Sequence, residues 1–219
     1  MAEPSVAVKA LAHWLTTGLP LVIATPIFAL FLNLDLTATA AVATREYLER
    51  TVAACRKHGI LLAYDNAYCE LTYDGYVAPS IFDIPGARDV AIEFFSLSKS
   101  FSMTGWRIGF AVGRAPFVGP LTQVKTYTDT GPFLAVQEAG AAVLDKAEEL
   151  TAPICAEIAR RRDAAVPVLR AAGFQVELPK AAMYLWVGLP PGVNSKAFAR
   201  RALEAERLDQ RGGRDRTGV

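Results

Sequence analysis

Two groups of polar residues, each at the end of an apolar stretch, could carry chemistry. Asp65 and Asn66 close ILLAYD, whereas Ser96, Ser98 and Lys99 close AIEFFS. A carboxylate and a lysine amine can transfer protons or form covalent bonds, and hydroxyls can donate hydrogen bonds to a ligand. Each residue also has a structural explanation, because Asp and Asn form turns, serines cap helices and lysines are common surface charges. Their combination favours a functional site.

The segments that position these residues alternate between expected strands and helices. Strands are predicted for IFALFLN, ILLAYD, AIEFFS and RIGFAVG, and the first two are expected to be buried. Thr44 can cap a helix that has apolar residues on one face and ends at Gly59. We therefore predict an α/β protein with an open, mostly parallel sheet flanked by helices. In such sheets ligands bind beyond the carboxyl ends of the strands, where both polar groups fall.

The segments AYDNAY and SLSKSFSMTGWRIGFAVG together resemble the active-site centre of the class I/II, fold-type I aminotransferases, which use pyridoxal phosphate. The longer run from Tyr64 to Gly113 is most similar to the LL-diaminopimelate aminotransferase branch, which serves lysine biosynthesis. A looser similarity extends from Leu30 to about Glu204. The resemblance implies an incomplete fold-type I large domain and part of a small α+β carboxy-terminal domain.

The resemblance gives three of the residues roles in catalysis and ring binding. Lys99 would hold pyridoxal 5'-phosphate as a Schiff base and then act as the catalytic base. Asp65 would pair with the pyridinium nitrogen, which keeps the ring able to accept electrons. Tyr68 would hydrogen-bond the ring hydroxyl. These residues would therefore form the catalytic part of the site.

The resemblance also implies phosphate ligands, substrates and an assembly. Ser96 and Arg107 would bind the cofactor phosphate through a hydroxyl and a planar guanidinium, and Ser98 is a weaker candidate. The substrates would be an amino acid, with LL-diaminopimelate as one candidate, and a 2-oxo acid. The family resemblance further implies a homodimer in the cytoplasm.

One segment departs from the family pattern. Where the family reads LNYPNNPTGAVA, this sequence reads LNLDLTATAAVA, so Thr37 replaces the asparagine that contacts the cofactor hydroxyl and the substrate carboxylate. A hydroxyl cannot make all the hydrogen bonds of an amide. The family's amino-terminal phosphate loop and its carboxy-terminal substrate-binding arginine are not recognisable either. The alternative function is a non-catalytic or truncated remnant that retains only the cofactor-binding centre.

The sequence divides into three expected parts. Residues 1–145 would form the partial large domain and residues 146–204 the partial small domain. Residues 205–219 are charged and lack helical periodicity, which predicts a disordered tail.

Within the small domain we expect one long helix and one strand pair. The helix would span about residues 147–172, with Pro153 and Pro167 breaking or bounding it. FQVELPKAAMYLWVGL is typical of two strands around a turn. Within it, Tyr184 and Trp186 are interpreted as core residues rather than ligands.

Composition argues against several other classes of partner. The 23 basic and 22 acidic residues nearly cancel, which argues against nucleic acid or an anionic membrane surface as a partner. The three widely spaced cysteines and two histidines argue against a disulfide framework or a zinc site. Reduced thiols fit a cytosolic protein best.

The segment from Ala10 to Leu34 has two explanations. It contains no Asp, Glu, Lys or Arg, which is typical of a signal or membrane segment. Pro20 and Pro26 interrupt it, however, and a strand buried on both faces is equally apolar. We expect a core strand here, with a targeting segment as the alternative.

Overall fold

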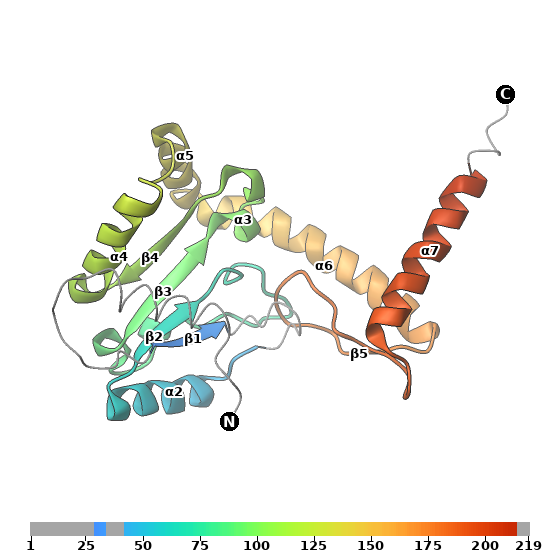
Figure 1. Cartoon of the computed structure of the whole chain (residues 1–219), viewed down its shortest axis with the longest axis horizontal. Coiled ribbons are helices and arrows are strands. Elements are labelled where there is room, and N and C mark those ends of the chain that lie inside the picture. The colour runs from blue at the N-terminus through green and yellow to red at the C-terminus, as the bar shows by residue number, and fades with distance from the viewer. Residues whose placement is uncertain (1–28, 34–41, 214–219) are drawn as a thin grey trace.

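The computed structural model describes residues 29–33 and 42–213 (Figure 1). Thr37, the predicted departure from the family pattern, lies outside these residues, as does most of the apolar stretch from Ala10 to Leu34. Residues 29–33 of that stretch form a sheet strand, as the core-strand interpretation expects. No described helix is both long enough and apolar enough to cross a membrane.

A four-stranded sheet forms the centre of the larger part (Figure 1). Its strands, in spatial order, are β1 (Ala29–Asn33), β2 (Leu61–Asp65), β3 (Ala91–Ser96) and β4 (Gly109–Gly113). The first three are parallel and β4 is antiparallel to β3. The predicted mostly parallel α/β sheet is therefore confirmed. Because β2 and β3 are parallel, their carboxyl ends meet at the same edge.

Helix α2 (Arg45–His58) covers one face of this sheet (Figure 1). The Thr44 hydroxyl accepts the N–H of Tyr47 at 3.2 Å, so it caps the helix as predicted. Gly59 ends the helix with a φ of 64°, a left-handed conformation that glycine adopts without steric cost. The buried face of α2 packs against Leu62 and Tyr64 of β2.

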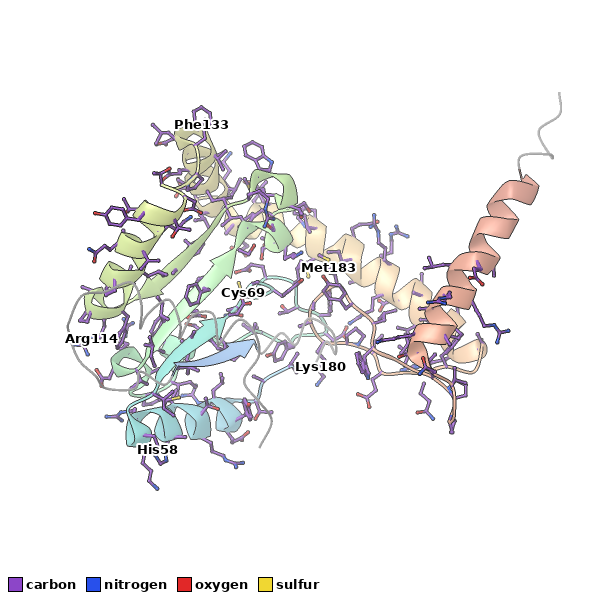
Figure 2. The ribbon with its side chains drawn as sticks, viewed as in Figure 1. His58, Cys69, Arg114, Phe133, Lys180 and Met183 are labelled. Atoms are coloured by element: carbon purple, nitrogen blue, oxygen red, sulfur yellow. The ribbon has the colours of Figure 1, made fainter. Side chains whose placement is uncertain are left out.

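Short elements connect the strands, and two helices lie beside β4. The connecting elements are η1 (Ile81–Asp83), η2 (Ala87–Asp89), α3 (Leu97–Ser100) and η3 (Thr104–Trp106). The two helices are α4 (Ala115–Thr128) and α5 (Leu134–Leu144) (Figure 1). Large apolar side chains remain exposed here, and Phe133 extends outward at the start of α5 (Figure 2). This side of the sheet is much less covered than the α2 side.

Helix α6 (Ala147–Ala171) continues without a break through Pro153 and Pro167, so the prediction that these prolines interrupt or bound it is wrong. Each proline removes one backbone donor. Packing of Ile154 and Ile158 against Leu71 and its neighbours outweighs that loss.

The carboxy-terminal part contains a short strand pair and a final helix. Strands β5 (Gln175–Val176) and β6 (Val187–Gly188) pair antiparallel, which confirms the predicted strand pair. Helix α7 (Ser195–Gly213) projects away from the rest of the molecule (Figure 1). Residues 205–213 are thus helical, and the prediction of a disordered tail is wrong for them because Ala, Leu, Glu and Arg extend a helix once it has started. The domain boundaries at residues 145 and 204 stay a prediction.

Candidate active site at the ends of β2 and β3

Lys99 lies on the short helix α3, directly after β3. Ser96 ends the strand and caps the helix, since its hydroxyl accepts the N–H of Ser98 at 3.3 Å. The Lys99 side chain is partly buried, and its Nζ lies 5.7 Å from the centre of the Tyr68 ring. A cation at this distance is attracted to the ring. Two predicted site residues from different strand ends are therefore neighbours.

Asp65 and Tyr68 reach the same edge from β2. Asp65 is the last residue of β2 and pairs in register with Phe94, two residues before Ser96. A turn follows, in which the N–H of Leu71 donates to the Tyr68 carbonyl at 2.8 Å. Tyr68 is almost fully buried, whereas Asp65 is half-buried. Asp65 and Tyr68 thus lie at the same edge of the sheet as Lys99.

Arg107 approaches the site through an unusual backbone conformation. It ends η3 with a φ of 53°, a left-handed geometry that is unfavourable for a residue with a side chain. The next residue is fixed, because the Ile108 carbonyl accepts the N–H of Leu97 at 3.2 Å. The Arg107 guanidinium is exposed and donates to the Thr104 carbonyl at 3.0 Å. Arg107 is therefore held beside the start of α3 with donors still facing solvent.

The two serines differ in their surroundings. Ser98 is buried, and its carbonyl accepts the Thr104 hydroxyl at 3.0 Å, so it mainly holds α3 against η3. Ser96 is half-buried and keeps its own hydroxyl proton for donation, since the capping bond uses only its oxygen. The geometry favours Ser96 over Ser98 as a ligand, which agrees in direction with the expectation from sequence.

A close approach of β3 and β4 requires glycine near the site. A Cβ on Gly109 would lie 2.5 Å from the Phe95 carbonyl oxygen, closer than real contacts allow. Gly109 pairs with Ser96, so any side chain there would push the two strands apart at the point where α3 begins. Glycine at this position keeps the site edge compact.

Glu93 is a buried carboxylate that sequence analysis did not single out. It is fully buried on β3 and accepts hydrogen bonds from Asn66 at 2.8 Å and from the Ser80 hydroxyl at 2.6 Å. Burial raises the pKa of Glu93, and the hydrogen bonds from Ser80 and Asn66 partly oppose that shift. Asn66 directly follows Asp65, the last residue of β2. The hydrogen bond from Asn66 to Glu93 therefore fixes the backbone next to the Asp65 carboxylate.

Arg162 of α6 ties the segment that follows Tyr68 to the carboxy-terminal part. Only 6% of its side chain is exposed, and it donates to both carboxylate oxygens of Asp74, at 2.8 and 3.1 Å. It also donates to the Pro179 carbonyl at 2.9 Å and lies 4.7 Å from the centre of the Tyr73 ring. The hydrogen bonds from Arg162 lower the pKa of Asp74. Arg162 therefore joins three segments that are distant in the sequence.

Tyr73 strengthens the same junction. Its hydroxyl donates to the Ala182 carbonyl at 2.6 Å, and Thr72 and Ala181 form an antiparallel bridge. Burial, followed by the nearby Cys155, raises the pKa of Tyr73 to about 12, although Arg162 opposes the shift. The phenol consequently stays a hydrogen-bond donor at neutral pH.

Tyr184 and Trp186 are not core residues, so this interpretation of the sequence is wrong. Their exposed fractions are 38% and 59%. Strand β6 begins only at Val187, so neither residue lies in the strand pair. Instead, the Tyr184 hydroxyl accepts a hydrogen bond from the Tyr68 hydroxyl at 3.2 Å. The sequence carries no local signal for this contact, because it depends on pairing between distant segments.

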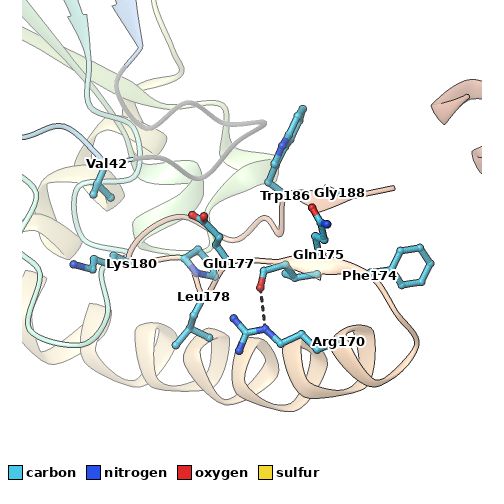
Figure 3. Close-up of a pocket in the computed structure, with 11 residues that line it drawn as sticks. Val42, Arg170, Phe174, Gln175, Glu177, Leu178, Lys180, Trp186 and Gly188 are labelled. Atoms are coloured by element: carbon cyan, nitrogen blue, oxygen red, sulfur yellow. Dashed lines mark hydrogen bonds between the residues drawn. The ribbon is translucent and has the colours of Figure 1, made fainter. Parts of the chain in front are cut away.

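Two hollows among the described residues lie in different places. One cavity of about 750 Å³ is lined by residues from Arg170 to Gly188 and by Val42 (Figure 3). Arg170 donates there to the Val176 carbonyl at 2.9 Å, and none of the predicted site residues lines this cavity. A second hollow of about 660 Å³, between α6 and the segment 182–185, includes Tyr184. None of the predicted site residues lines this second hollow either, but Tyr184 in its wall contacts Tyr68. Among the described residues, no group of His, Cys, Asp and Glu could hold a metal ion.

Comparison with known proteins shows the family to which this chain belongs. The family model "Aminotransferase class I and II" matches residues 37–210. LL-diaminopimelate aminotransferase 2 of Trichormus variabilis is 47% identical over 175 residues, which are 80% of this chain and 45% of that protein. Glutamate-pyruvate aminotransferase AlaC of Escherichia coli is 42% identical over 173 residues, covering 78% of this chain and 42% of that protein.

Solved structures of aminotransferases have the same fold as this chain. An aminotransferase from Staphylococcus aureus superimposes with a TM-score of 0.73 at 30% identity, covering 79% of this chain and 46% of that one. The chain belongs to the class I and II aminotransferase family. It spans somewhat less than half the length of the curated relatives it matches. A second family model, "CcmB protein", matches residues 1–52, most of which lie outside the described residues.

The residues at the sheet edge fit the cofactor of this family, pyridoxal phosphate. Lys99 offers an amine within 5.7 Å of the Tyr68 ring, and Asp65 offers a carboxylate at the neighbouring strand end. Ser96 at the start of α3 and Arg107 at the end of η3 offer hydrogen-bond donors. This set matches an aldehyde, a ring nitrogen, a ring hydroxyl and a phosphate in chemical type.

Proposed function

We propose that this chain carries the pyridoxal-phosphate centre of an aminotransferase, which moves an amino group between an amino acid and a 2-oxo acid. One observation carries the proposal: the amine of Lys99 lies beside the Tyr68 ring at the sheet edge where Asp65 ends β2. Parallel sheets of this kind bind ligands at that edge. The family relationship supports the same conclusion.

Each residue has a distinct proposed role. When bound, pyridoxal phosphate supplies an electron-accepting ring that stabilises a carbanion. Lys99 forms the covalent bond to the cofactor and afterwards carries the proton that is moved on the substrate. Asp65 keeps the ring nitrogen protonated through its negative charge. Tyr68 donates a hydrogen bond to the ring hydroxyl.

We assign the cofactor phosphate to Ser96, at the start of α3, and to Arg107, at the end of η3. Ser96 donates one hydroxyl, and Arg107 offers a planar pair of N–H donors that can take two phosphate oxygens. Ser98 contributes by holding α3 rather than by direct binding, because it is buried. Arg107 is exposed, so its share of the binding energy is expected to depend on salt concentration.

The substrate class follows from the relatives by analogy. Two similar proteins bear the names LL-diaminopimelate aminotransferase 2 and glutamate-pyruvate aminotransferase, so LL-diaminopimelate, glutamate and pyruvate are the substrates to test first. We further infer action in the cytoplasm as a homodimer, as the family resemblance implies, with neither nucleic acid nor membrane as a partner.

The test is a transamination assay at saturating pyridoxal phosphate, with LL-diaminopimelate, glutamate and aspartate as amino donors and 2-oxo acids, pyruvate among them, as acceptors, over a wide concentration range. Amino-acid-dependent formation of the matching product, lost in Lys99→Ala and retained in Lys125→Ala, is the expected result. Lys125 is a matched control because it lies exposed on α4 and pairs with Asp129. Cofactor bound at Lys99 without turnover would instead favour the remnant that Thr37 suggests. No cofactor binding at all would refute the proposal.

A further inference from the structure

Tyr184 has no role in the proposed chemistry so far, although its hydroxyl contacts that of Tyr68. We infer that Tyr184 is a positioning residue: its hydroxyl hydrogen-bonds to Tyr68 and thereby sets the strength of the hydrogen bond that Tyr68 gives to the cofactor ring. The inference rests on the proposed function and adds a residue to it from a different part of the chain.

The contact between the two phenols is specific in geometry. Their oxygens are 3.2 Å apart, and the rings meet edge to face with centres 6.0 Å apart and planes at 69°. Tyr68 is only 2% exposed, so its hydroxyl depends on protein partners rather than on bulk water. Tyr184 stays partly exposed. It therefore stands between a buried hydroxyl of the site and the solvent.

The segment that carries Tyr184 is firmly fixed. The N–H of Ala182 donates to the Leu71 carbonyl at 2.9 Å, and the Tyr73 hydroxyl donates to the Ala182 carbonyl at 2.6 Å. Ala182 itself has a φ of 64°, an unfavourable geometry for alanine that these bonds hold in place. Since Tyr184 lies two residues further on, its position is set by the same contacts.

A phenol can donate one hydrogen bond while its oxygen accepts another. In the structure the Tyr68 hydroxyl donates to Tyr184. When Tyr68 donates to a cofactor oxygen instead, the direction reverses and Tyr184 donates to Tyr68. Consecutive hydrogen bonds polarise one another, so the outer bond strengthens the inner one. Removing the Tyr184 hydroxyl should therefore weaken the action of Tyr68 without abolishing it.

The effect should reach Lys99, because its Nζ lies 5.7 Å from the centre of the Tyr68 ring. A change in the hydrogen bond to the cofactor ring hydroxyl would alter the charge distribution of the ring. It would therefore alter the proton affinity of the nitrogen atom through which Lys99 is bonded to the cofactor. That proton affinity is visible as a pH-dependent absorbance change of the loaded protein. Absorbance consequently provides a reading that does not depend on turnover.

A simple packing role for Tyr184 makes a different prediction. Tyr184→Phe keeps the ring and its edge-to-face contact and removes only the hydroxyl. If Tyr184 merely fills space, this substitution leaves the midpoint pH of the absorbance change where it is. If the hydroxyl acts through Tyr68, the midpoint moves even though the fold is unchanged.

The experiment compares the unmodified chain with Tyr184→Phe, Tyr68→Phe and the double variant, all loaded with pyridoxal 5'-phosphate. Tyr127→Phe is the matched control, because Tyr127 is 84% exposed on α4 and loses the same atom. We expect Tyr184→Phe to shift the midpoint by about half a pH unit to one unit, the size that one hydrogen bond produces. The shift should have the same sign as that of Tyr68→Phe and be smaller.

The double variant decides whether Tyr184 acts through Tyr68. We expect it to match Tyr68→Phe, with no added shift, because coupled residues are not additive. Equal midpoints for Tyr184→Phe and Tyr127→Phe, or full additivity in the double variant, would overturn the inference and leave the proposed function standing. Failure of borohydride to fix the cofactor on Lys99 in the unmodified chain would refute the proposed function and this inference together.

Discussion

The two sides of the central sheet differ sharply in how completely they are packed. On the α2 side, Leu48 and Leu62 are fully buried among the side chains of α2, β2 and the η1–η2 region. On the side of β4, α4 and α5, large apolar residues such as Phe133 and Leu134 are mostly exposed (Figure 2). None of the predicted site residues belongs to the buried cluster around α2. Tyr68 belongs to a second buried cluster, with Leu71 and Ala182, against which residues of α6 pack. The candidate site therefore lies at the sheet edge, outside the core on the α2 side.

The difference in packing between the two sides is tested most directly by truncating one leucine on each side. Leu62→Ala should lower the free energy of unfolding by about 2–5 kcal/mol, because it removes a fully buried side chain and leaves a cavity. Leu134→Ala should change it by no more than about 0.5 kcal/mol, since 64% of Leu134 is exposed. Urea unfolding measures both. Similar losses would show that the α5 side is packed as tightly as the α2 side.

The contact between α6 and the segment that follows Tyr68, which Arg162 makes through Asp74, can be tested with two adjacent arginines. Arg162→Ala should destabilise the protein by roughly 2–4 kcal/mol, because it removes a buried guanidinium with charged and backbone partners. Arg161→Ala removes an exposed residue paired with Glu157 and should cost less than about 1 kcal/mol. Thermal or urea unfolding of the two variants provides the comparison. An equal cost would mean that Arg162 does not join the segments.

Asp65→Asn tests the site carboxylate separately from the fold. The substitution keeps the shape but removes the negative charge, so amino-acid-dependent conversion of the loaded protein should fall by about 10- to 150-fold. Retention of the cofactor at Lys99 should fall much less. Asp145→Asn, at the exposed end of α5, is the control. Parallel losses of conversion and retention would show that Asp65 is structural.

The smallest expected effect concerns Glu93 and pH. Because burial raises its pKa above the ordinary value of 4.5, the folded protein keeps a proton that the unfolded chain has already released in the window above that pH. Stability contributed by Glu93 therefore falls as pH rises through this window. Glu93→Gln cannot titrate, so its unfolding free energy relative to the unmodified protein should increase between about pH 4.5 and neutrality. A difference that is flat across this range would contradict the raised pKa.

The elements that local patterns specify were predictable from the sequence. The Thr44 cap, the Gly59 stop and the buried strands all follow from residues that are adjacent along the chain. The parallel arrangement of β2 and β3 then places Asp65 and Lys99 at one edge without further information. The two groups come together because both stand directly at strand ends, whereas their roles in binding and catalysis stay a prediction.

The contacts that the sequence did not reveal all join distant segments. Arg162 meets Asp74 across 88 residues, and Tyr68 meets Tyr184 across 116 residues. Such pairs produce no periodic pattern in the sequence, because each partner by itself is an ordinary polar or aromatic residue. The prediction that Pro153 interrupts α6 failed for a related reason. The tertiary packing of α6 outweighs the local helix-breaking preference of proline.

The central claim, that this chain carries a pyridoxal-phosphate site built around Lys99, is tested most directly by borohydride reduction of the loaded protein followed by peptide mapping. Reduction makes the bond between a lysine and the cofactor permanent, so the labelled residue can be identified by mass. The account predicts label on Lys99 in the unmodified chain and none in Lys99→Ala. Label distributed over exposed lysines such as Lys57 and Lys125, or unchanged in Lys99→Ala, would contradict it.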